Sequence, residues 1–429
     1  MIKLLIESFK TKEIRSRILF TLGILIVFRL GTHLTVPGVN AAALEELSSN
    51  SSLFSLLNTF GGGALDSYSI LALGVSPYIT SSIVVQLLQM DIIPKFAEWA
   101  KQGEVGRRKL NQVTRYLTIG LAFVQAIGIS FGFNALTGLV INPSTTTYLM
   151  IAIMLSAGTM FVMWLGEQIT VKGFGNGISM IIFSGIIARV PSDLGDFYNS
   201  QIRNAGDDMA QAILFAVLIA IAFVAIVVTV VYVENAKRKI PVQYSKRSAG
   251  SGQDTHLPLK VNSAGVIPVI FASSFIMTPQ TILGFFGATN ADAQWYIILN
   301  KIFNLQEPLG AVLYTVLIVV FTYFYAFIQV NPEKVAENLQ KQGGYIPSVR
   351  PGKPTQDFIS STLTRLSTVG AVYLGVIAIL PILASNVWNL PQSVSLGGTS
   401  LLIVVGVALE LMRQLEGQMS KKNYQGFIQ

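Results

Sequence analysis

The sequence predicts an all-α polytopic membrane protein with ten transmembrane helices, arranged as two inverted halves of five helices each. Three observations carry this prediction. The chain of 429 residues is 52% hydrophobic and 12% charged, and that charged share is about half of what a soluble domain carries. The apolar residues gather in ten runs, and the lysines and arginines lie almost entirely on one side of them. The apolar surplus is therefore expected to face lipid.

The ten runs are the predicted membrane spans, because a helix needs about 20 apolar residues to cross a bilayer. In chain order they cover about residues 18–36, 75–90, 116–134, 148–166, 176–190, 211–233, 265–286, 308–330, 366–385 and 397–413. The second, fifth and tenth runs are short. The first run is predicted to be a helix and not a cleaved signal peptide, since it contains Arg29 and is followed by further spans.

The positive charges predict that both termini are cytoplasmic. With that orientation, most of the 30 lysines and arginines fall in cytoplasmic segments, and the opposite side carries only Arg189, Arg203 and Lys301. Because each half has an odd number of spans, five, the second half begins on the opposite side of the membrane from the first. The two halves therefore have opposite orientations, as in an inverted repeat. The predicted halves are residues 1–195 and 196–429.

The second span of each half is interrupted in a similar way. The run at 75–90 follows a glycine-rich stretch, and the run at 265–286 opens with Gly265 and Pro268. Corresponding interrupted helices point to the functional centre of a protein built from inverted repeats.

Charged residues are almost absent from the predicted spans. Arg29 lies well inside one, where it is expected to snorkel or to pair with a neighbouring helix, and Glu167 lies at the edge of another. An ion-coupled small-molecule transporter normally needs an ionisable group there, so this alternative is disfavoured. A membrane-embedded enzyme is disfavoured because no catalytic constellation is present. With no cysteine and two distant histidines, His33 and His256, no metal site and no cofactor are expected.

Small residues, hydroxyls and β-branched aliphatics dominate the spans instead. Such side chains can form an apolar constriction that closes by excluding water, and a deformable constriction suits a substrate of variable shape. A polypeptide channel is the function that this pattern favours.

Residues 53–74, before the second span, are too polar and glycine-rich to cross a membrane and too apolar for an exposed loop. The three consecutive glycines at 61–63 permit a sharp turn of the backbone. Two interpretations remain open from the residues alone, a re-entrant plug inside the protein and an amphipathic helix on the outer surface.

Two cytoplasmic loops, at 234–264 and 331–365, are long and rich in lysine, arginine, glycine and proline. They are either solvated connectors or a docking surface for an acidic partner such as ribosomal RNA or a cytosolic motor.

Seven sequence blocks identify a family. They read FGGGAL at 60–65, LGVSPYITSSI at 73–83, GEVGRRK at 103–109, GTMFVMWLGEQIT and GFGNGIS at 158–179, THLPLKVNSAGVIPVIFASS at 255–274 and GGTSLLIVV at 397–405. In these blocks and their order, from about residue 15 to 415, the chain resembles the SecY family, which forms the channel of the bacterial Sec protein translocon. The one departure is residues 248–254, where SAGSGQD stands in place of a longer basic and aromatic loop tip.

The resemblance implies two five-helix halves around a central pore in the bacterial cytoplasmic membrane. Such a channel translocates unfolded secretory polypeptides and releases transmembrane segments sideways into the lipid bilayer, and it is not an enzyme. The implied pore ring consists of Val75, Ile79, Ile178, Ile182, Ile270 and Ile403. The implied plug is about residues 53–72, centred on Phe60, Gly61, Gly62, Gly63, Ala64 and Leu65.

The same resemblance implies a lateral gate and a set of partners. The gate lies between spans 2 and 3 on one side and spans 7 and 8 on the other, with Gln86, Gln125 and Asn262 as candidates for a polar cluster across it. Docking through the basic loops is assigned to Arg107, Arg108, Lys246, Arg247 and Arg350. The implied partners are SecE, SecG, the SecA ATPase, the ribosome, signal sequences and the precursors of secreted and membrane proteins.

Overall fold

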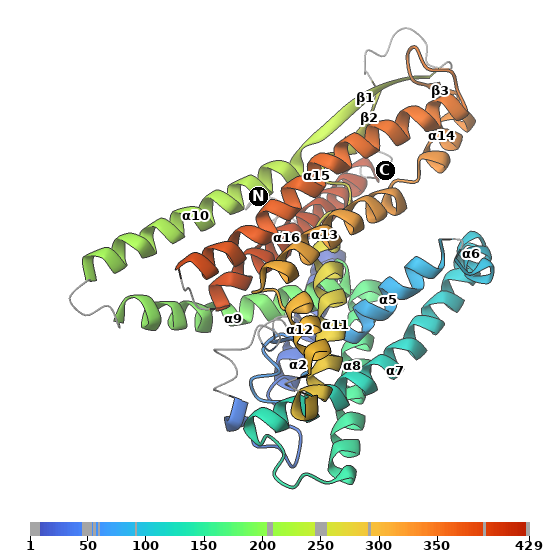
Figure 1. Ribbon diagram of the computed structural model, residues 1–429. Coiled ribbons are helices and arrows are strands. Elements are labelled where there is room, and N and C mark those ends of the chain that lie inside the picture. The colour runs from blue at the N-terminus through green and yellow to red at the C-terminus, as the bar shows by residue number, and fades with distance from the viewer. Residues whose placement is uncertain are drawn as a thin grey trace.

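The computed structural model describes residues 9–44, 54, 57–58, 61–90, 92–203, 209–244, 255–290, 293–388 and 392–425. Within these residues the protein is mostly helical, as predicted (Figure 1). One small sheet is also present, which the all-α prediction did not include.

The helices of the predicted first half begin with α2, and a short 3₁₀ turn at Ala41–Leu44 follows it. Their bounds are α2 Lys12–Gly31, α5 Ser76–Leu88, α6 Pro94–Lys101, α7 Glu104–Thr137, α8 Thr145–Lys172 and α9 Gly177–Gln201. Helix α9 continues past residue 195, so the link between the predicted halves follows Gln201.

The predicted second half contains the remaining helices and the three strands. Their bounds are α10 Met209–Asn235, β1 Lys237–Tyr244, β2 Thr255–Lys260, α11 Ile267–Asn290, α12 Gln294–Phe303, α13 Pro308–Gln329, α14 Pro332–Lys341, β3 Gly344–Tyr345, α15 Lys353–Trp388 and α16 Gln392–Gln425.

Each of the ten predicted spans overlaps one helix, namely α2, α5, α7, α8, α9, α10, α11, α13, α15 and α16. Within the described residues, six of these are long and apolar enough to cross a membrane on their own: α7, α8, α9, α10, α13 and α15. Helix α5 has 13 residues, which at 1.5 Å per residue is about 20 Å and short of the roughly 30 Å hydrocarbon core. Helix α2 falls short because it carries several charges.

A single apolar core joins helices from both predicted halves. Its fully buried members include Phe28 in α2, Ile151 in α8, Ile276 in α11 and Leu374 in α15. Helix α7 packs against α8 and α11, while α13 packs against α15. The core therefore passes through the region where the interrupted helices α5 and α11 meet.

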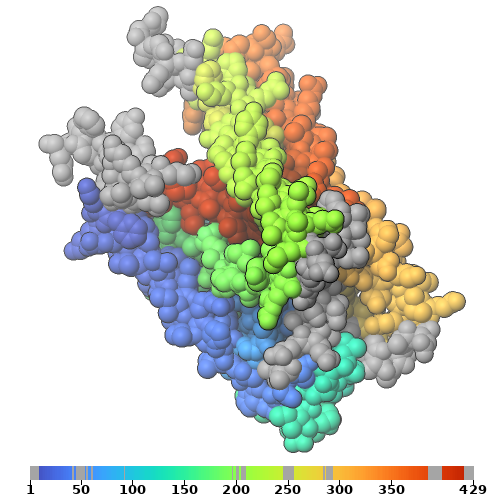
Figure 2. Space-filling model, turned by 90° about the vertical axis from the view of Figure 1, so that its left-hand side faces the viewer, coloured from blue at the N-terminus to red at the C-terminus, as the bar shows by residue number. Residues whose placement is uncertain are grey.

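Helix α10 stands apart from this core. Only 6% of its most apolar stretch is buried, and large side chains such as Val224 and Val228 are exposed. Figure 2 shows α10, in yellow-green, lying on the surface of the molecule. An apolar helix in this position is compatible with a lipid environment and not with water.

The sheet joins the two long loops that were predicted to be cytoplasmic and that lie far apart in the sequence. Its strand order is β2-β1-β3, with Lys237 opposite Lys260 and Gln243 opposite Tyr345 in antiparallel register. Ile240 in β1 packs with Leu339 and Ile359 in a small core of its own. The sheet, α14 and the beginning of α15 form one end of the molecule (Figure 1). The described parts of the two loops therefore form one structured unit and not two independent connectors.

Candidate functional site

The glycine-rich segment before α5 forms buried turns between α2 and α9. Gly62 has φ +69°, and a Cβ at this position would lie 3.0 Å from the Phe28 ring and 3.1 Å from Cα of Gly185. Only glycine adopts this conformation in so little space. Non-helical backbone is tolerated at membrane depth when protein surrounds it. Here α2 and α9 lie on either side of the turn.

The described residues 61–74 of this segment are mostly buried and not helical, although Asp66 is exposed and residues 54, 57 and 58 are helical. Ala64, Leu65 and Tyr68 are at most 1% exposed, and residues 61–75 form turns. Of the two interpretations left open by the sequence, the described part of the segment resembles a re-entrant element and not a surface helix. Phe60 lies outside the described residues.

Arg29, the one charge deep in a predicted span, contacts this segment. Its Nη1 donates a hydrogen bond of 2.5 Å to the main-chain oxygen of Gly62. The sequence predicted snorkelling or a partner on another helix, whereas the partner is a carbonyl of the glycine turn. A charged donor to a carbonyl is among the stronger hydrogen bonds in proteins.

The six predicted ring residues come from four helices and from the residue before α5. Val75, Ile79, Ile182, Ile270 and Ile403 are 1% to 5% exposed and belong to the main core, and Ile178 packs against that core while partly exposed. Their side chains are all aliphatic. Aliphatic groups from α5, α9, α11 and α16 that meet in one cluster can exclude water and ions.

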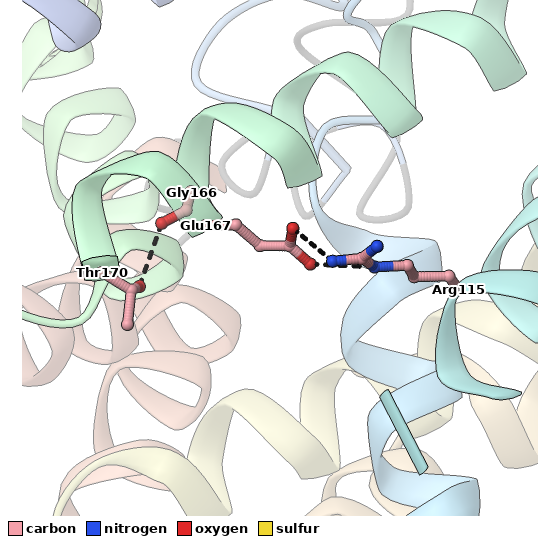
Figure 3. Close-up of polar contacts among 4 residues, drawn as sticks. All are labelled: Arg115, Gly166, Glu167 and Thr170. Atoms are coloured by element: carbon pink, nitrogen blue, oxygen red, sulfur yellow. Dashed lines mark hydrogen bonds and ion pairs between the residues drawn. The ribbon is translucent and has the colours of Figure 1, made fainter. Parts of the chain in front are cut away.

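Ile178 also takes part in a close contact between α8 and α9. A Cβ on Gly177 would lie 1.8 Å from the carbonyl oxygen of Gly166, and one on Gly166 would lie 2.7 Å from Cδ1 of Ile178. Thr170 Oγ1 donates to Gly166 O at 3.0 Å (Figure 3) and accepts from Gly177 N at 2.9 Å. Asn176 caps α9 through its side chain, so the position of Ile178 is fixed by this joint.

The acidic residue at the edge of a span, Glu167, forms an ion pair. Both of its carboxylate oxygens accept hydrogen bonds from Arg115 of α7, at 3.1 Å and 2.6 Å (Figure 3). Two-point arginine–carboxylate contacts hold their partners in a fixed orientation. Glu167 therefore joins α7 to α8.

The predicted lateral gate is a closely packed contact. Helix α11 packs against both α5 and α7. Thr278 of α11 lies 3.2 Å from the Thr80 hydroxyl of α5 and accepts from Gln125 Nε2 of α7 at 3.2 Å. A Cβ on Gly128 of α7 would lie 2.9 Å from the main-chain oxygen of Thr281, so the two helices approach closely at this glycine.

The three candidate gate residues have different hydrogen-bond partners. Gln125 reaches across to α11, whereas Gln86 Nε2 donates to Ser82 of its own helix at 3.0 Å. Asn262 Nδ2 donates to Glu234 of α10 at 2.6 Å and to Gly265 O at 3.0 Å. The structure thus places Asn262 at the junction of α10 and α11. Sequence reasoning missed Thr278 and Glu234, because no pattern distinguishes them from other hydroxyls and acids.

Glu234 lies in a polar junction at the end of α10. It is 4% exposed, and its main-chain oxygen accepts a hydrogen bond from the guanidinium of Arg413 in α16. On the adjoining strand, burial lowers the pKa of Lys260, because loss of solvent disfavours its charged form. The junction connects the sheet to α10, α11 and α16.

The predicted docking residues are exposed where they are described. Arg107 and Arg108 lie in the first turns of α7, and Arg350 precedes α15. The exposed start of β1 adds Lys237, Arg238 and Lys239. Lys246 and Arg247 lie outside the described residues. The sheet joins the two loops, since β3 of the second loop pairs with the end of β1 in the first.

Metal binding finds no support within the described residues. No group of three or more histidine, aspartate or glutamate side chains there could hold an ion.

Comparisons with known proteins point to one family. A model of the SecY family matches residues 69–412. The chain is 58% identical to a protein of Lactobacillus kefiranofaciens described as protein translocase subunit SecY 1, and the alignment covers 100% of both chains.

Two solved structures are similar over most of the chain. The first is described as the structure of a protein conducting channel, with a TM-score of 0.67, 17% identity and coverage of 94% of this chain and 92% of that one. The second is described as Sec61 in the canine ribosome-channel complex from the endoplasmic reticulum, with a TM-score of 0.64, 17% identity and the same coverage. At these identities the likeness shows the fold.

Proposed function

The chain belongs to the SecY family, and from this premise we propose that it is the channel through which unfolded secretory polypeptides cross the bacterial cytoplasmic membrane. The observation that supports the proposal is that aliphatic side chains of α5, α9, α11 and α16 belong to one apolar core, which also includes Ala64 and Leu65 of the buried glycine-rich turns. A core of this kind can seal against ions and still yield to a polypeptide of any sequence.

The proposed topology has ten spans in two halves, which were predicted at residues 1–195 and 196–429 and are joined after the end of α9 at Gln201, with both termini cytoplasmic. The charge asymmetry supports the orientation, and the overlap of each predicted span with a helix supports the count. Spans shorter than the hydrocarbon core, such as α5, are reasonable where the neighbouring backbone is surrounded by protein.

In the proposed mechanism, the ring of Val75, Ile79, Ile178, Ile182, Ile270 and Ile403 closes the pore, and residues 53–72 plug it from the outer side. A translocating polypeptide displaces the plug and fills the ring, so the seal against ions is kept during transport. Contacts between the ring and a translocating polypeptide are weak and non-directional because the ring side chains are apolar. The translocating polypeptide can therefore slide through the ring.

The proposed lateral exit lies between α5 and α7 on one side and α11 and α13 on the other. The hydrogen bonds of Thr278 and the close approach at Gly128 are the contacts that must separate. An apolar signal sequence lowers the cost of this separation by covering the exposed helix faces on its way to lipid.

The channel itself supplies no energy, so we assign that role to partners. The exposed basic residues Arg107, Arg108, Arg350 and those at the start of β1 fit an acidic partner, which would be the SecA ATPase or the ribosome. One of the similar structures is described as a ribosome-channel complex. SecE and SecG are the proposed membrane subunits, and lipid covers the remaining apolar faces.

A cross-linking experiment tests the proposal. A cysteine at Ile270 and another in a stalled secretory precursor are oxidised in membranes that contain SecE, SecA and ATP. The chain has no cysteine of its own, so the background is clean. We expect a disulfide only with a precursor that carries a signal sequence.

The matched control is a cysteine at Val228, which is 62% exposed on α10 and should not meet the precursor. Translocation without any cross-link at Ile270 would exclude this residue from the ring. Failure of every precursor to translocate would contradict the channel function itself.

A further inference from the structure

Helix α12 is too short to cross a membrane and lies between two of the predicted spans. Its 10 residues, Gln294–Phe303, are about 15 Å long at 1.5 Å per residue, about half of the roughly 30 Å hydrocarbon core. It follows α11, precedes α13 and packs against both of them (Figure 1). In the proposed topology these neighbours form one side of the lateral gate, and α12 joins their outer ends.

One face of α12 packs on the protein. Its members recur at a spacing of three and four residues, and each is partly buried: Tyr296, Leu299 and Phe303. The turn that follows lies close against α13, because a Cβ on Gly310 would lie 1.9 Å from the main-chain oxygen of Asn304. The inner face and this close approach together fix the orientation of α12 relative to α13.

A second face of α12 is apolar and largely exposed. It consists of Trp295, Ile298 and Ile302, which repeat at the same helical spacing. Trp295 is 45% exposed and Ile298 is 56% exposed, while Ile302 is partly buried. The remaining exposed positions include Asn300 and Lys301, which are polar. A short helix with an apolar stripe, a tryptophan in it and a lysine at its edge is typical of helices that lie on a membrane surface.

The apolar stripe continues onto the neighbouring helices. The Trp295 ring lies 5.9 Å, between centroids, from the ring of Phe286 in α11, which is itself exposed. At the start of α13, Leu309 and Val312 are exposed as well. Because α11 and α13 are predicted spans, lipid is expected to cover these side chains, and the stripe of α12 extends the same surface.

We propose that α12 lies in the headgroup boundary of the outer leaflet, with Trp295, Ile298 and Ile302 in lipid and Asn300 towards water. Its partner is the lipid surface of the membrane, so the connection between the two gate helices is a membrane-bound element and not a loop in water. The inference rests on the proposed function, in which this end of α11 and α13 is on the outer side. In this position α12 holds the outer ends of both gate helices at the depth of the headgroups.

A lipid surface fits this face better than a protein partner does. The stripe is one side chain wide and about 10 Å long, whereas a stable protein interface buries about 800 Å² on each partner. Tryptophan is enriched where one end of its ring is in an apolar layer and the other is wet. Lys301 extends from the edge of the stripe, where its amino group can reach lipid phosphates while its alkyl chain contacts apolar groups.

Spin labels at two neighbouring positions test the proposal. Ile298→Cys and Asn300→Cys, each in the otherwise cysteine-free chain, are labelled and reconstituted with SecE in vesicles of phosphatidylethanolamine and phosphatidylglycerol. Both side chains are exposed and lie about 160° apart around the helix axis, so neither label disturbs the packing. Collisions with oxygen, which concentrates in lipid, and with a polar nickel chelate, which stays in water, report the surroundings of each label.

We expect the Ile298 label to collide mainly with oxygen and the Asn300 label mainly with the nickel chelate. In intact cells, a membrane-impermeant maleimide added outside should react with Ile298→Cys about tenfold more slowly than with Asn300→Cys. Equal access of the nickel chelate to both labels would overturn the proposal, because α12 would then lie in water. Shielding of the Ile298 label from both reagents would also overturn it, since protein, such as a second copy of the chain, would then cover the stripe.

Failure of the proposed function would give a different result. Translocation of a secretory precursor is measured with the unlabelled parent and with both labelled variants in the same vesicles. A water-exposed Ile298 label in vesicles that translocate would reject the membrane-surface position of α12 and leave the channel function standing. Absence of translocation by the parent would contradict the channel function, whatever the surroundings of the two labels.

Discussion

At the residue scale, Thr278 is the hydroxyl that links the two sides of the proposed lateral gate. It receives the Gln125 amide and lies against Thr80, and so links α11 to both α7 and α5. Gln125 was a candidate because of the resemblance to the SecY family. The sequence did not suggest Thr278, since a threonine can satisfy its own hydroxyl within the helix, as Thr278 also does with Ser274 O.

Thr278→Val is expected to open the gate more readily. The change keeps the volume and removes the acceptor of Gln125, which is 2% exposed. Losing such a bond in a membrane protein costs about 1 kcal/mol, or roughly fivefold in the open population. The measurement is translocation of precursors with weakened signal sequences, which should rise by about that factor.

Ser273→Ala is the matched control for this variant. It removes another hydroxyl contact of α11, to Tyr314 of α13, which lies on the same side of the gate. Equal effects of the two variants would mean that loss of a hydroxyl in α11, and not the contact across the gate, changes signal selection.

At the element scale, the joint between α8 and α9 has no room for a side chain at Gly177. A Cβ there would lie 1.8 Å from the Gly166 carbonyl oxygen, so Gly177→Ala must push the helices apart. We expect a loss of about 1–3 kcal/mol in the free energy of unfolding, as is usual for overpacking. Thermal denaturation of the detergent-solubilised complex measures it.

Gly195→Ala provides the comparison, because it lies in the same helix and a Cβ there meets nothing within 4 Å. It should be neutral or stabilise the helix by up to about 1 kcal/mol. A similar melting temperature for both variants would show that the joint can relax and that the contact at Gly177 does not set the helix spacing.

The helices were predictable from the sequence, and the sheet was not, for physical reasons. Apolar runs of about 15 to 23 residues can be recognised in a sequence, because a helix that crosses a lipid bilayer must have a certain length and an apolar composition. The strands β1 and β2 contain Pro241 and Pro258 and many charges, which is not a strand pattern. Their pairing depends on contacts between distant loops, such as Gln243 with Tyr345.

The candidate site was predictable in part for the same reason. The glycine turn was noticed because three consecutive glycines disfavour a continuous helix and permit a sharp turn inside an apolar stretch. The position of Asn262 was not predictable, because the junction with Glu234 depends on how β2 leads into α11. Arg29 was noticed as an unusual charge inside a predicted span. Its partner is a backbone carbonyl, and because every residue has one, this partner could not be identified from the sequence.

At the scale of the whole molecule, the inverted arrangement of the two halves is tested by sidedness. With both termini cytoplasmic, single cysteines at Asn142 and Lys301 should react from outside intact cells with a membrane-impermeant maleimide, and those at Lys101 and Arg350 only after permeabilisation. The four positions bracket α7 in the first half and α13 in the second. In an inverted repeat, these third spans of the two halves run in opposite directions. Outside labelling of Lys101 or Arg350 would reverse the orientation of that half and remove the basis for a pore between inverted halves.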